Sequence, residues 1–432
     1  MLIATFPMGH SLGSPTKLQI TMSAAAARRK KQLQNRAKGS TGPSIDPVQS
    51  RLDALLSDPS LSEESVAYEA LQLAQSSVRR NVKIGNYSQG VEVAYATSLA
   101  LLSKSGRVSV SSQLLTEFVK VLVETHTAYS EDWGDKFGKL NEAYRTALEG
   151  DKTMDPAERG RLQRLHLQFL RKGLKWSNDL GNARHGAVEI HALLADHCWY
   201  MSCDQAVVAA DAMKGPAKTA NVDEEEENAE EWSESALRNE AVTYYALAEK
   251  TSLILEKLKS LPGPTDEETK MGHTCPPCQR DALLTRSILS LLAIENLKDA
   301  TSLASSFMKE VESRSADELK KSYLDKTDGK APSHIMFVNM LLRICEKDTK
   351  TAPLFTWLVK NFGAELGTMH NPEKIKSYTT KIGKVYFDIQ PPPSMMAMME
   401  NMMGMMGGGG MGGGGMNPAM MQAAMAAMQG GM

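Results

Sequence analysis

The sequence predicts an all-α protein, an α-solenoid of stacked antiparallel helix pairs with degenerate, tetratricopeptide-like repeats. Between about residues 50 and 390, apolar residues recur at spacings of three and four, which is the helical period. These segments are separated by short loops, as in proteins built from stacked helix pairs. Alternating runs of Val, Ile, Thr and Tyr are scarce, so no sheet is predicted.

The helical period defines each expected element in turn, and turn-forming residues such as Gly85 and Asn86 separate the first two. The expected helices cover residues 63–80, 88–104, 109–128, 133–149, 155–179, 184–201, 203–214, 234–260, 278–294, 296–314, 333–347, 351–363 and 371–388. No clean repeat consensus emerges, so we expect the repeats to be degenerate; an irregular helical globule is the alternative fold.

The expected organisation has a solenoid flanked by two segments of unusual composition. An acidic loop with the run Asp223–Glu227 divides the solenoid, and two further loops are expected at 261–278 and 320–333, the latter with a hairpin signal at Asp328-Gly329. The expected parts are a disordered basic arm 1–49, an N-terminal half 50–215, a C-terminal half 233–390 and a low-complexity tail 391–432.

The two chain ends carry the unusual composition. Residues 1 to 45 hold seven Lys or Arg and no acid, which predicts a solvated arm; a transit peptide and a nuclear-localisation or anionic-surface patch are alternatives. Residues 394 to 432 hold 15 of the 26 Met and most of a long Gly run. We expect a low-complexity tail, with an apolar-segment-binding module or a self-association helix as alternatives, because Met suits adaptable hydrophobic surfaces.

The amino-acid composition limits the classes of partner and the cellular compartment that we expect. The formal net charge of −2 gives the chain no bulk attraction for nucleic acid or anionic membrane. The longest apolar runs fall short of eighteen residues, so no membrane span is expected. Five irregularly spaced Cys fit a reducing compartment, and we expect a cytosolic protein.

Catalytic motifs are missing from the sequence. It has no GxxxxGK[ST] loop, no GxGxxG after a strand, no HExxH and no GxSxG, so a non-enzymatic protein without cofactor is expected. Cys275 and Cys278, with His273 nearby, are weak metal candidates because a second ligand pair is missing. An unliganded pair, a zinc site and a redox-sensitive pair all stay open.

Two other groups of residues are interpreted as packing. His185, His191 and His197 lie six apart on a helical pattern, a spacing that does not keep them on one face, so packed or exposed histidines are expected. The large aromatics Trp176, Trp199 and Trp357 are expected to be core anchors between helices rather than a ligand-binding set.

Several short elements, in order, resemble one known family. They are Tyr68-Glu69-Ala70, the turn Gly85-Asn86-Tyr87, Leu174-Lys175-Trp176-Ser177, Gly181-Asn182-Ala183-Arg184-His185 with the helix to Trp199, the segment 283–307, and Lys381-Ile382-Gly383-Lys384-Val385-Tyr386-Phe387 before the prolines. Their order and spacing resemble the Golgi-to-ER-traffic factor four family, the adaptor of the guided-entry pathway for tail-anchored proteins.

The resemblance implies a helical solenoid that bridges two partners. Its N-terminal half would dock the pathway's dimeric targeting ATPase, and its C-terminal half would hold a ubiquitin-like, co-chaperone-bound partner through a loop near 314–335. In animals the family also joins a larger ubiquitin-like scaffold. The candidate ATPase-docking residues are Arg79, Arg80, Lys83 and Glu92, and the candidate partner-docking residues are Phe337, Leu341 and Leu342. Core packing explains the three apolar residues about equally well.

Two features depart from the family. Gln113 stands where relatives carry an acid before the apolar run of the third helix, which puts that ATPase contact in doubt. The tail is much longer than in relatives and resembles the Met-rich client-binding end of the pathway's tetratricopeptide co-chaperone, so contact with hydrophobic client segments is expected. Alternative functions are a scaffold subunit of another cytosolic complex and a metal- or redox-dependent protein using Cys275 and Cys278.

Overall fold

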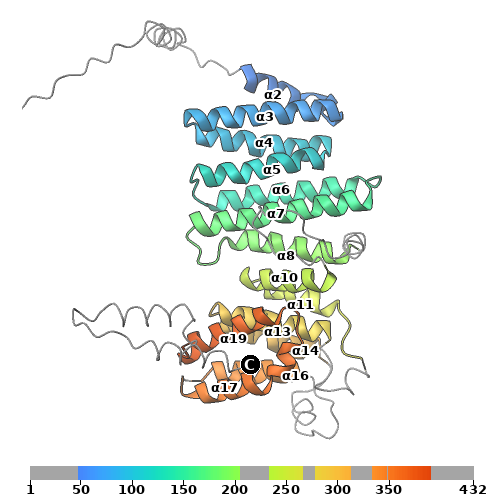
Figure 1. Ribbon diagram of the computed structural model, residues 1–432. Coiled ribbons are helices and arrows are strands. Elements are labelled where there is room, and N and C mark those ends of the chain that lie inside the picture. Colours follow the sequence, from blue (N-terminus) through green and yellow to red (C-terminus); the bar gives the residue numbers. More distant parts are fainter. Residues whose placement is uncertain (1–46, 205–232, 266–277, 313–332, 348, 391–432) are drawn as a thin grey trace, which may run out of the picture.

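The helices follow one another as a stack that runs from α2 at one end to α17 at the other (Figure 1). Neighbouring helices pack in succession, and several also contact the next but one, as α4 does with α6 and α5 with α7. Within the described residues the only bridge pairs Arg184 with Gly186, and no strand forms. The predicted all-α solenoid is confirmed. The computed structural model describes residues 47–204, 233–265, 278–312, 333–347 and 349–390.

The N-terminal layers are formed by long helices, most of which have one apolar face. They are α2 (Pro47–Ser57), the 3-10 turn η1 (Pro59–Ser62), α3 (Glu64–Ile84), α4 (Tyr87–Ser105), α5 (Val108–Glu124), α6 (Glu131–Gly150), α7 (Pro156–Leu180) and α8 (Val188–Cys203).

The C-terminal layers use shorter helices that surround one central helix. They are α10 (Glu234–Leu247), α11 (Thr251–Lys259), α13 (Gln279–Ala293), α14 (Leu297–Glu310), α16 (Ser333–Cys345), the 3-10 turn η3 (Thr349–Thr351), α17 (Ala352–Asn361), α18 (Gly363–Gly367) and α19 (Pro372–Phe387).

Glycine sets the sharp turn between α3 and α4. Gly85 has φ of 80°, a left-handed conformation that costs glycine little and other residues more. The amide of Asn86 donates to the carbonyl of Asn81 at 2.9 Å, which closes the helix end. Helix α3 therefore runs one turn beyond the expected end at residue 80, because the cap rather than the apolar period terminates it.

One expected helix is divided in two. The expected helix 234–260 breaks after Leu247, because Glu249 takes φ of 56° and the amide of Lys250 donates to the carbonyl of Tyr245 at 2.9 Å. This is a helix C-terminal closure built without glycine, so the sequence carried no signal for it. Similarly, α17 ends at Asn361 and the short α18 follows, where one helix 351–363 was expected.

Several expected segments lie partly or wholly outside the described residues. Helix α2 begins at Pro47, so the last residues of the expected arm 1–49 are helical. The rest of that arm, the expected helix 203–214 beyond Asp204, the acidic run at 223–227, the Asp328-Gly329 turn and the tail from 391 lie outside the described residues.

Aromatic rings form the core between α5, α6 and α7. Phe137 of α6 stacks on Phe169 at 5.1 Å and on Trp176 at 5.9 Å between ring centroids, and Phe118 of α5 joins at 5.8 Å from Phe137. The indole Nε1 of Trp176 donates to the carbonyl of Thr127 at 2.8 Å, so its one polar atom is satisfied inside the core.

Helix α13 forms the centre of the C-terminal half. It packs against α10, α11, α14, α16 and α19, and all of its residues except Gln279 and Ala282 are buried. A helix that is buried all round is expected only in the interior of a larger assembly of helices. The C-terminal half is therefore a cluster around α13 rather than a continued row of pairs.

The three tryptophans expected in the core behave differently. Trp176 is 1% exposed and Trp199 is 8% exposed, so both predictions are confirmed. Trp357 is 51% exposed on the outer face of α17, so the expectation that it anchors the core was wrong. The inner face of α17 is filled by Phe355 and Leu358 instead, which leaves position 357 pointing outward.

Replacing the two kinds of tryptophan should separate their roles. Trp176→Ala removes a ring from the aromatic core and should lower the free energy of unfolding by about 3–5 kcal/mol. Trp357→Ala removes a half-exposed side chain and should cost well under half as much. Urea unfolding followed by circular dichroism measures both changes, and equal costs would contradict this assignment of core and surface.

Candidate interaction surfaces

A basic surface lies at the end of α3. Arg79, Arg80 and Lys83 are exposed there within one turn of the helix, next to the Gly85 turn. The guanidinium of Arg79 lies 3.7 Å from the carboxylate of Glu117 on α5, and both charges remain accessible to solvent. Exposed pairs of this kind add little stability, and all three cations are accessible from solvent.

Glu92, the fourth predicted ATPase-docking residue, is held within the fold. Its carboxylate accepts from Lys136 Nζ of α6 at 2.6 Å. The same ammonium lies 4.4 Å from the ring centroid of Trp133 and 4.9 Å from that of Tyr95. Glu92 therefore joins α4 to α6 through this ion pair.

Sequence reasoning missed the apolar part of this surface. Ile84 is 69% exposed and Tyr87 is 47% exposed, one on each side of the α3–α4 turn. The sequence signal for this apolar surface was Ile84, an apolar residue directly before the helix-ending Gly85. Gln113 is exposed on α5, and Glu117 lies one turn further along the same helix, where it faces Arg79.

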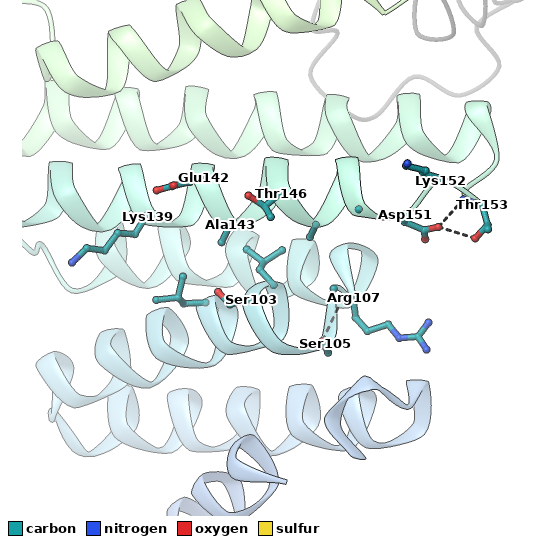
Figure 2. A pocket seen from close by; sticks show the side chains of 15 residues that line it. Ser103, Ser105, Arg107, Lys139, Glu142, Ala143, Thr146, Asp151, Lys152 and Thr153 are labelled. Carbon is teal, nitrogen blue, oxygen red and sulfur yellow. Dashed lines mark hydrogen bonds between the residues drawn. The ribbon is translucent and has the colours of Figure 1, made fainter. Parts of the chain in front are cut away.

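An open groove of about 890 Å³ lies at the opposite end of α4 from this surface, between the α4–α5 turn and the C-terminal half of α6 (Figure 2). Leu99, Leu102, Ala143 and Ala147 form its apolar floor. Polar side chains surround the floor, among them Ser103, Arg107, Lys139, Glu142, Thr146 and Asp151.

The groove shows no catalytic arrangement among its described residues. The carboxylate of Asp151 accepts from the amide and hydroxyl of Thr153, at 3.0 and 2.8 Å. These hydrogen bonds hold the pKa of Asp151 below its usual value, so it stays ionised and is a poor proton donor. The groove is better suited to binding a chain segment than to chemistry.

Three histidines of the N-terminal half, His166, His191 and His197, belong to the interior. His166 and His197 are buried with ring centroids 4.8 Å apart, and their Nε2 atoms bond Asn141 Oδ1 at 2.8 Å and the carbonyl of Gln163 at 2.9 Å. His191 Nε2 bonds the carbonyl of His185 at 2.7 Å. Burial lowers the pKa of His197 to about 4 and that of His166 well below its usual value, so both rings are neutral near pH 7.

The thiol of Cys278 is buried and has a raised pKa. Its side chain is buried at the start of α13, and burial, with Asp281 nearby, raises the pKa of the thiol to about 12. A redox-active thiol reacts as its thiolate, which this environment disfavours. Cys275 and His273 lie outside the described residues, and within the described residues no cluster of three or more potential ligands is found.

The predicted partner-docking residues lie in the core of the C-terminal half. Phe337 and Leu341 are fully buried, and Leu342 is 5% exposed. Phe337 packs against Phe362 with ring centroids 5.5 Å apart. Core packing, the alternative that the sequence left open, describes these three side chains, and their docking role stays a prediction. The loop expected near 314–335 lies outside the described residues up to residue 332.

The family-like elements also have structural positions. Ser177, in the Leu174–Ser177 element, donates from its hydroxyl to the carbonyl of Leu174 at 2.8 Å and accepts from the amide of Ala187 at 3.0 Å. The element therefore fixes the entry into α8, beside the buried ring of Trp176.

Known proteins match the chain over most of its length. The family model described as Golgi to ER traffic protein 4 matches residues 85–407, well over half of the chain. The chain belongs to this family. Protein GET4 of Arabidopsis thaliana is 21% identical over 377 residues, covering 84% of this chain and 97% of the relative. A solved structure, described as the crystal structure of C. therm. Get4, matches with a TM-score of 0.46 and 18% identity over 86% of this chain and 99% of its own.

Membership in the Golgi to ER traffic protein 4 family places the chain in the guided-entry pathway for tail-anchored proteins, in an adaptor-type family. None of the helices in the described part of the chain is long and apolar enough to cross a membrane. The interaction surfaces described above are therefore the features to which the pathway role should be related.

Acid should weaken the N-terminal half through its buried histidines. The folded-state pKa of His197, about 4, lies below the ordinary value of 6.5, so the stabilising contribution is complete above pH 6.5 and is lost as pH falls toward 4. Each unit of pH in this window should remove about 1.4 kcal/mol per fully buried imidazole. His197→Gln should flatten the decline in urea midpoint between pH 7 and 4.5; an unchanged slope would exclude this histidine as the cause.

Proposed function

We propose that this protein is a non-enzymatic, cytosolic adaptor that bridges a targeting ATPase and a ubiquitin-like, co-chaperone-bound partner during post-translational delivery of tail-anchored proteins to the ER membrane. The family supports the pathway. The observation that carries the bridging role is the separation of two candidate surfaces, one on α3–α4 and one on α16, by several layers of the stack (Figure 1).

The ATPase-docking surface is proposed at the α3–α4 end. Arg79, Arg80 and Lys83 give it positive charge, and the exposed side chains of Ile84 and Tyr87 give it an apolar centre. Apolar or aromatic groups surrounded by charge are typical of protein-binding sites, where the charges speed and orient association. The proposed partner surface is therefore acidic with a small apolar depression.

The docking surface for the ubiquitin-like partner is proposed on the outer side of α16. Phe337, Leu341 and Leu342 pack inward and hold α16 in place, so the contacts would come from its other side. Arg343 and Lys347 are exposed there, and Met340 is partly exposed. These residues directly follow the segment in which the family resemblance implies a partner-binding loop.

The physical action of such an adaptor is co-localisation. Holding two proteins on one rigid body raises the effective concentration of each for the other, without any chemical step by the adaptor. Continuous packing from α3 to α16 supplies the rigidity. The alternative of a redox-dependent protein is disfavoured by the buried, high-pKa thiol of Cys278, and the alternatives of a metal-dependent protein and of another cytosolic scaffold are disfavoured by the family match.

Charge reversal tests the ATPase-docking surface. The triple change Arg79→Glu, Arg80→Glu and Lys83→Glu should abolish co-purification of the tail-anchored-protein ATPase, because like charges would then face each other. The ubiquitin-like partner should still be recovered at the unchanged level. Bait purification from cytosol with quantitative mass spectrometry measures both.

The matched control reverses two exposed cations on α19, Lys376→Glu and Lys384→Glu, which lie in the C-terminal half. Recovery of the ATPase with this control but not with the triple variant would support the assignment. Full ATPase recovery with the triple variant would rule out the α3 surface, and recovery of other complexes in place of both partners would overturn the adaptor function itself.

Two substitutions on α16 distinguish a residue of the core from a residue that contacts the partner. Phe337→Ala should lower the free energy of unfolding by about 3–5 kcal/mol, because it empties a fully buried site. Arg343→Glu should leave the thermal midpoint nearly unchanged but weaken recovery of the ubiquitin-like partner. For both variants, calorimetry measures the affinity for a purified ubiquitin-like partner, and thermal melting measures the stability. If the Arg343→Glu variant binds that partner with wild-type affinity, α16 is not part of the interface.

A further inference from the structure

The outer face of α17 is apolar and uncovered within the described residues. Leu354 is 55% exposed and Trp357 is 51% exposed, one helical turn apart, with exposed Pro353 beside them. Helix α17 lies at the end of the stack (Figure 1). The other large exposed apolar residues lie on four different helices: Tyr68, Ile84, Tyr87, Val123 and Val188.

An apolar outer face is unexpected at this place. Terminal layers of helical arrays usually present a polar outer face, because no further layer covers them. A half-exposed Trp next to a Leu is, in contrast, typical of the centre of a binding site. The outer face of α17 therefore needs an apolar segment to cover it.

The chain itself leaves the described structure next to this helix. Phe387, the last residue of α19, stacks on Phe355 of α17 with ring centroids 4.6 Å apart and planes inclined by 24°. The amide of Ile389 donates to the carbonyl of Gly383 at 3.0 Å, and Gly383 lies against the Phe355 ring. The described part of the chain therefore ends, at Gln390, beside the flank of α17.

The residues that follow are long enough to reach the outer face. Pro391, Pro392, Pro393 and Ser394 come first. In an extended, polyproline-like path they span about 12 Å. A helix with its side chains is about 10–12 Å across. A quarter of the corresponding circumference, roughly 8–9 Å, separates the flank of α17 from its outer face, so Met395 can lie on the outer face.

The chemistry of the next residues fits the uncovered face. Residues 395–406 hold eight Met and a single charge, Glu400. Met395, Met398, Met399 and Met402 have the spacing that places side chains on one face of a helix. Methionine is flexible and makes favourable contacts between its sulfur and aromatic rings, which suits an indole such as that of Trp357.

We propose that the Met-rich segment 395–406 of this chain docks on the outer face of α17, with its methionine side chains against Leu354 and Trp357. The docked segment would act as the missing cover of the terminal layer. An apolar client segment that binds the methionines would then compete with Trp357 for them. The proposal rests on the geometry of α17 and the course of the chain, and it is independent of the proposed ATPase and ubiquitin-like partners.

Crosslinking in the full-length chain tests the proposal. The chain is produced with photo-reactive methionine, irradiated when purified alone, and digested for mass spectrometry. Crosslinks from residues 395–406 to the peptide that contains Leu354 and Trp357 are expected. Crosslinks from the buried Met369, 3% exposed, provide an internal reference for labelling and folding. Mixing isotopically light and heavy chains distinguishes contacts within one chain from contacts between two.

Variants make the result specific. The double change Leu354→Glu and Trp357→Glu should remove most of these crosslinks while leaving those of Met369 in place. The control Val123→Glu, at a 47% exposed apolar position on α5, should leave both unchanged. A second measurement is acrylamide quenching of the Trp357 fluorescence, obtained as the difference from chains carrying Trp357→Phe. This quenching should increase when four methionines are replaced together: Met395→Ser, Met396→Ser, Met398→Ser and Met399→Ser.

Three outcomes would overturn the proposal. Mixed and unmixed crosslinks in equal shares, as random pairing of light and heavy chains gives, would show that a second copy covers α17. Tail crosslinks that spread over the body without favouring α17 would show no specific docking. Unchanged quenching of Trp357 after the methionine substitutions would show that the indole is already open to solvent in the full chain, and that its occupant is an external partner.

Discussion

Burial of α13 on every side is the constraint on which the C-terminal half depends. Its charged residues can be buried only because their partners are built in. Arg280 bonds Asp281 at 3.0 Å and Glu312 at 3.3 Å, and Arg286 donates to the carbonyl of His370. A buried charge is tolerated when it is paired in this way. Five helices are therefore arranged around α13 by its charges as well as by its leucines.

The same constraint links segments that are far apart in sequence. Glu312 lies directly after α14, while Arg280 lies in the first turn of α13, and Gly263 sits so close that a Cβ there would come within 2.8 Å of Arg280 Nη1. One guanidinium thus connects the two ends of the segment 278–312 and lies against the end of the segment 233–265. The N-terminal half has no comparable centre, and each layer there rests on its neighbours through rings such as Phe137 and Trp176. The molecule combines a linear array with a closed cluster.

Much of the helical fold could be predicted from the sequence. The helical spacing of apolar residues and the glycines at helix ends each depend only on residues that are close in the sequence. The broken helix at Glu249 could not be predicted, since a left-handed non-glycine residue leaves no mark in the sequence. The surfaces were harder still. Phe337 and Trp357 are both large and apolar, but one is buried and the other exposed, and only the three-dimensional arrangement of α16 and α17 separates them. The cations of α3 were easier, because charge itself predicts exposure.

The contact between Gly173 of α7 and Phe137 of α6 has a consequence for how this family varies. A Cβ at position 173 would lie 2.4 Å from Cε1 of Phe137, so the phenyl ring occupies the space that any side chain at 173 would need. The ring cannot move aside, because Phe169 and Trp176 stack against it. A relative with alanine at 173 therefore needs a smaller residue at 137, or wider spacing of α6 and α7. Substitutions at these two positions should be inherited together.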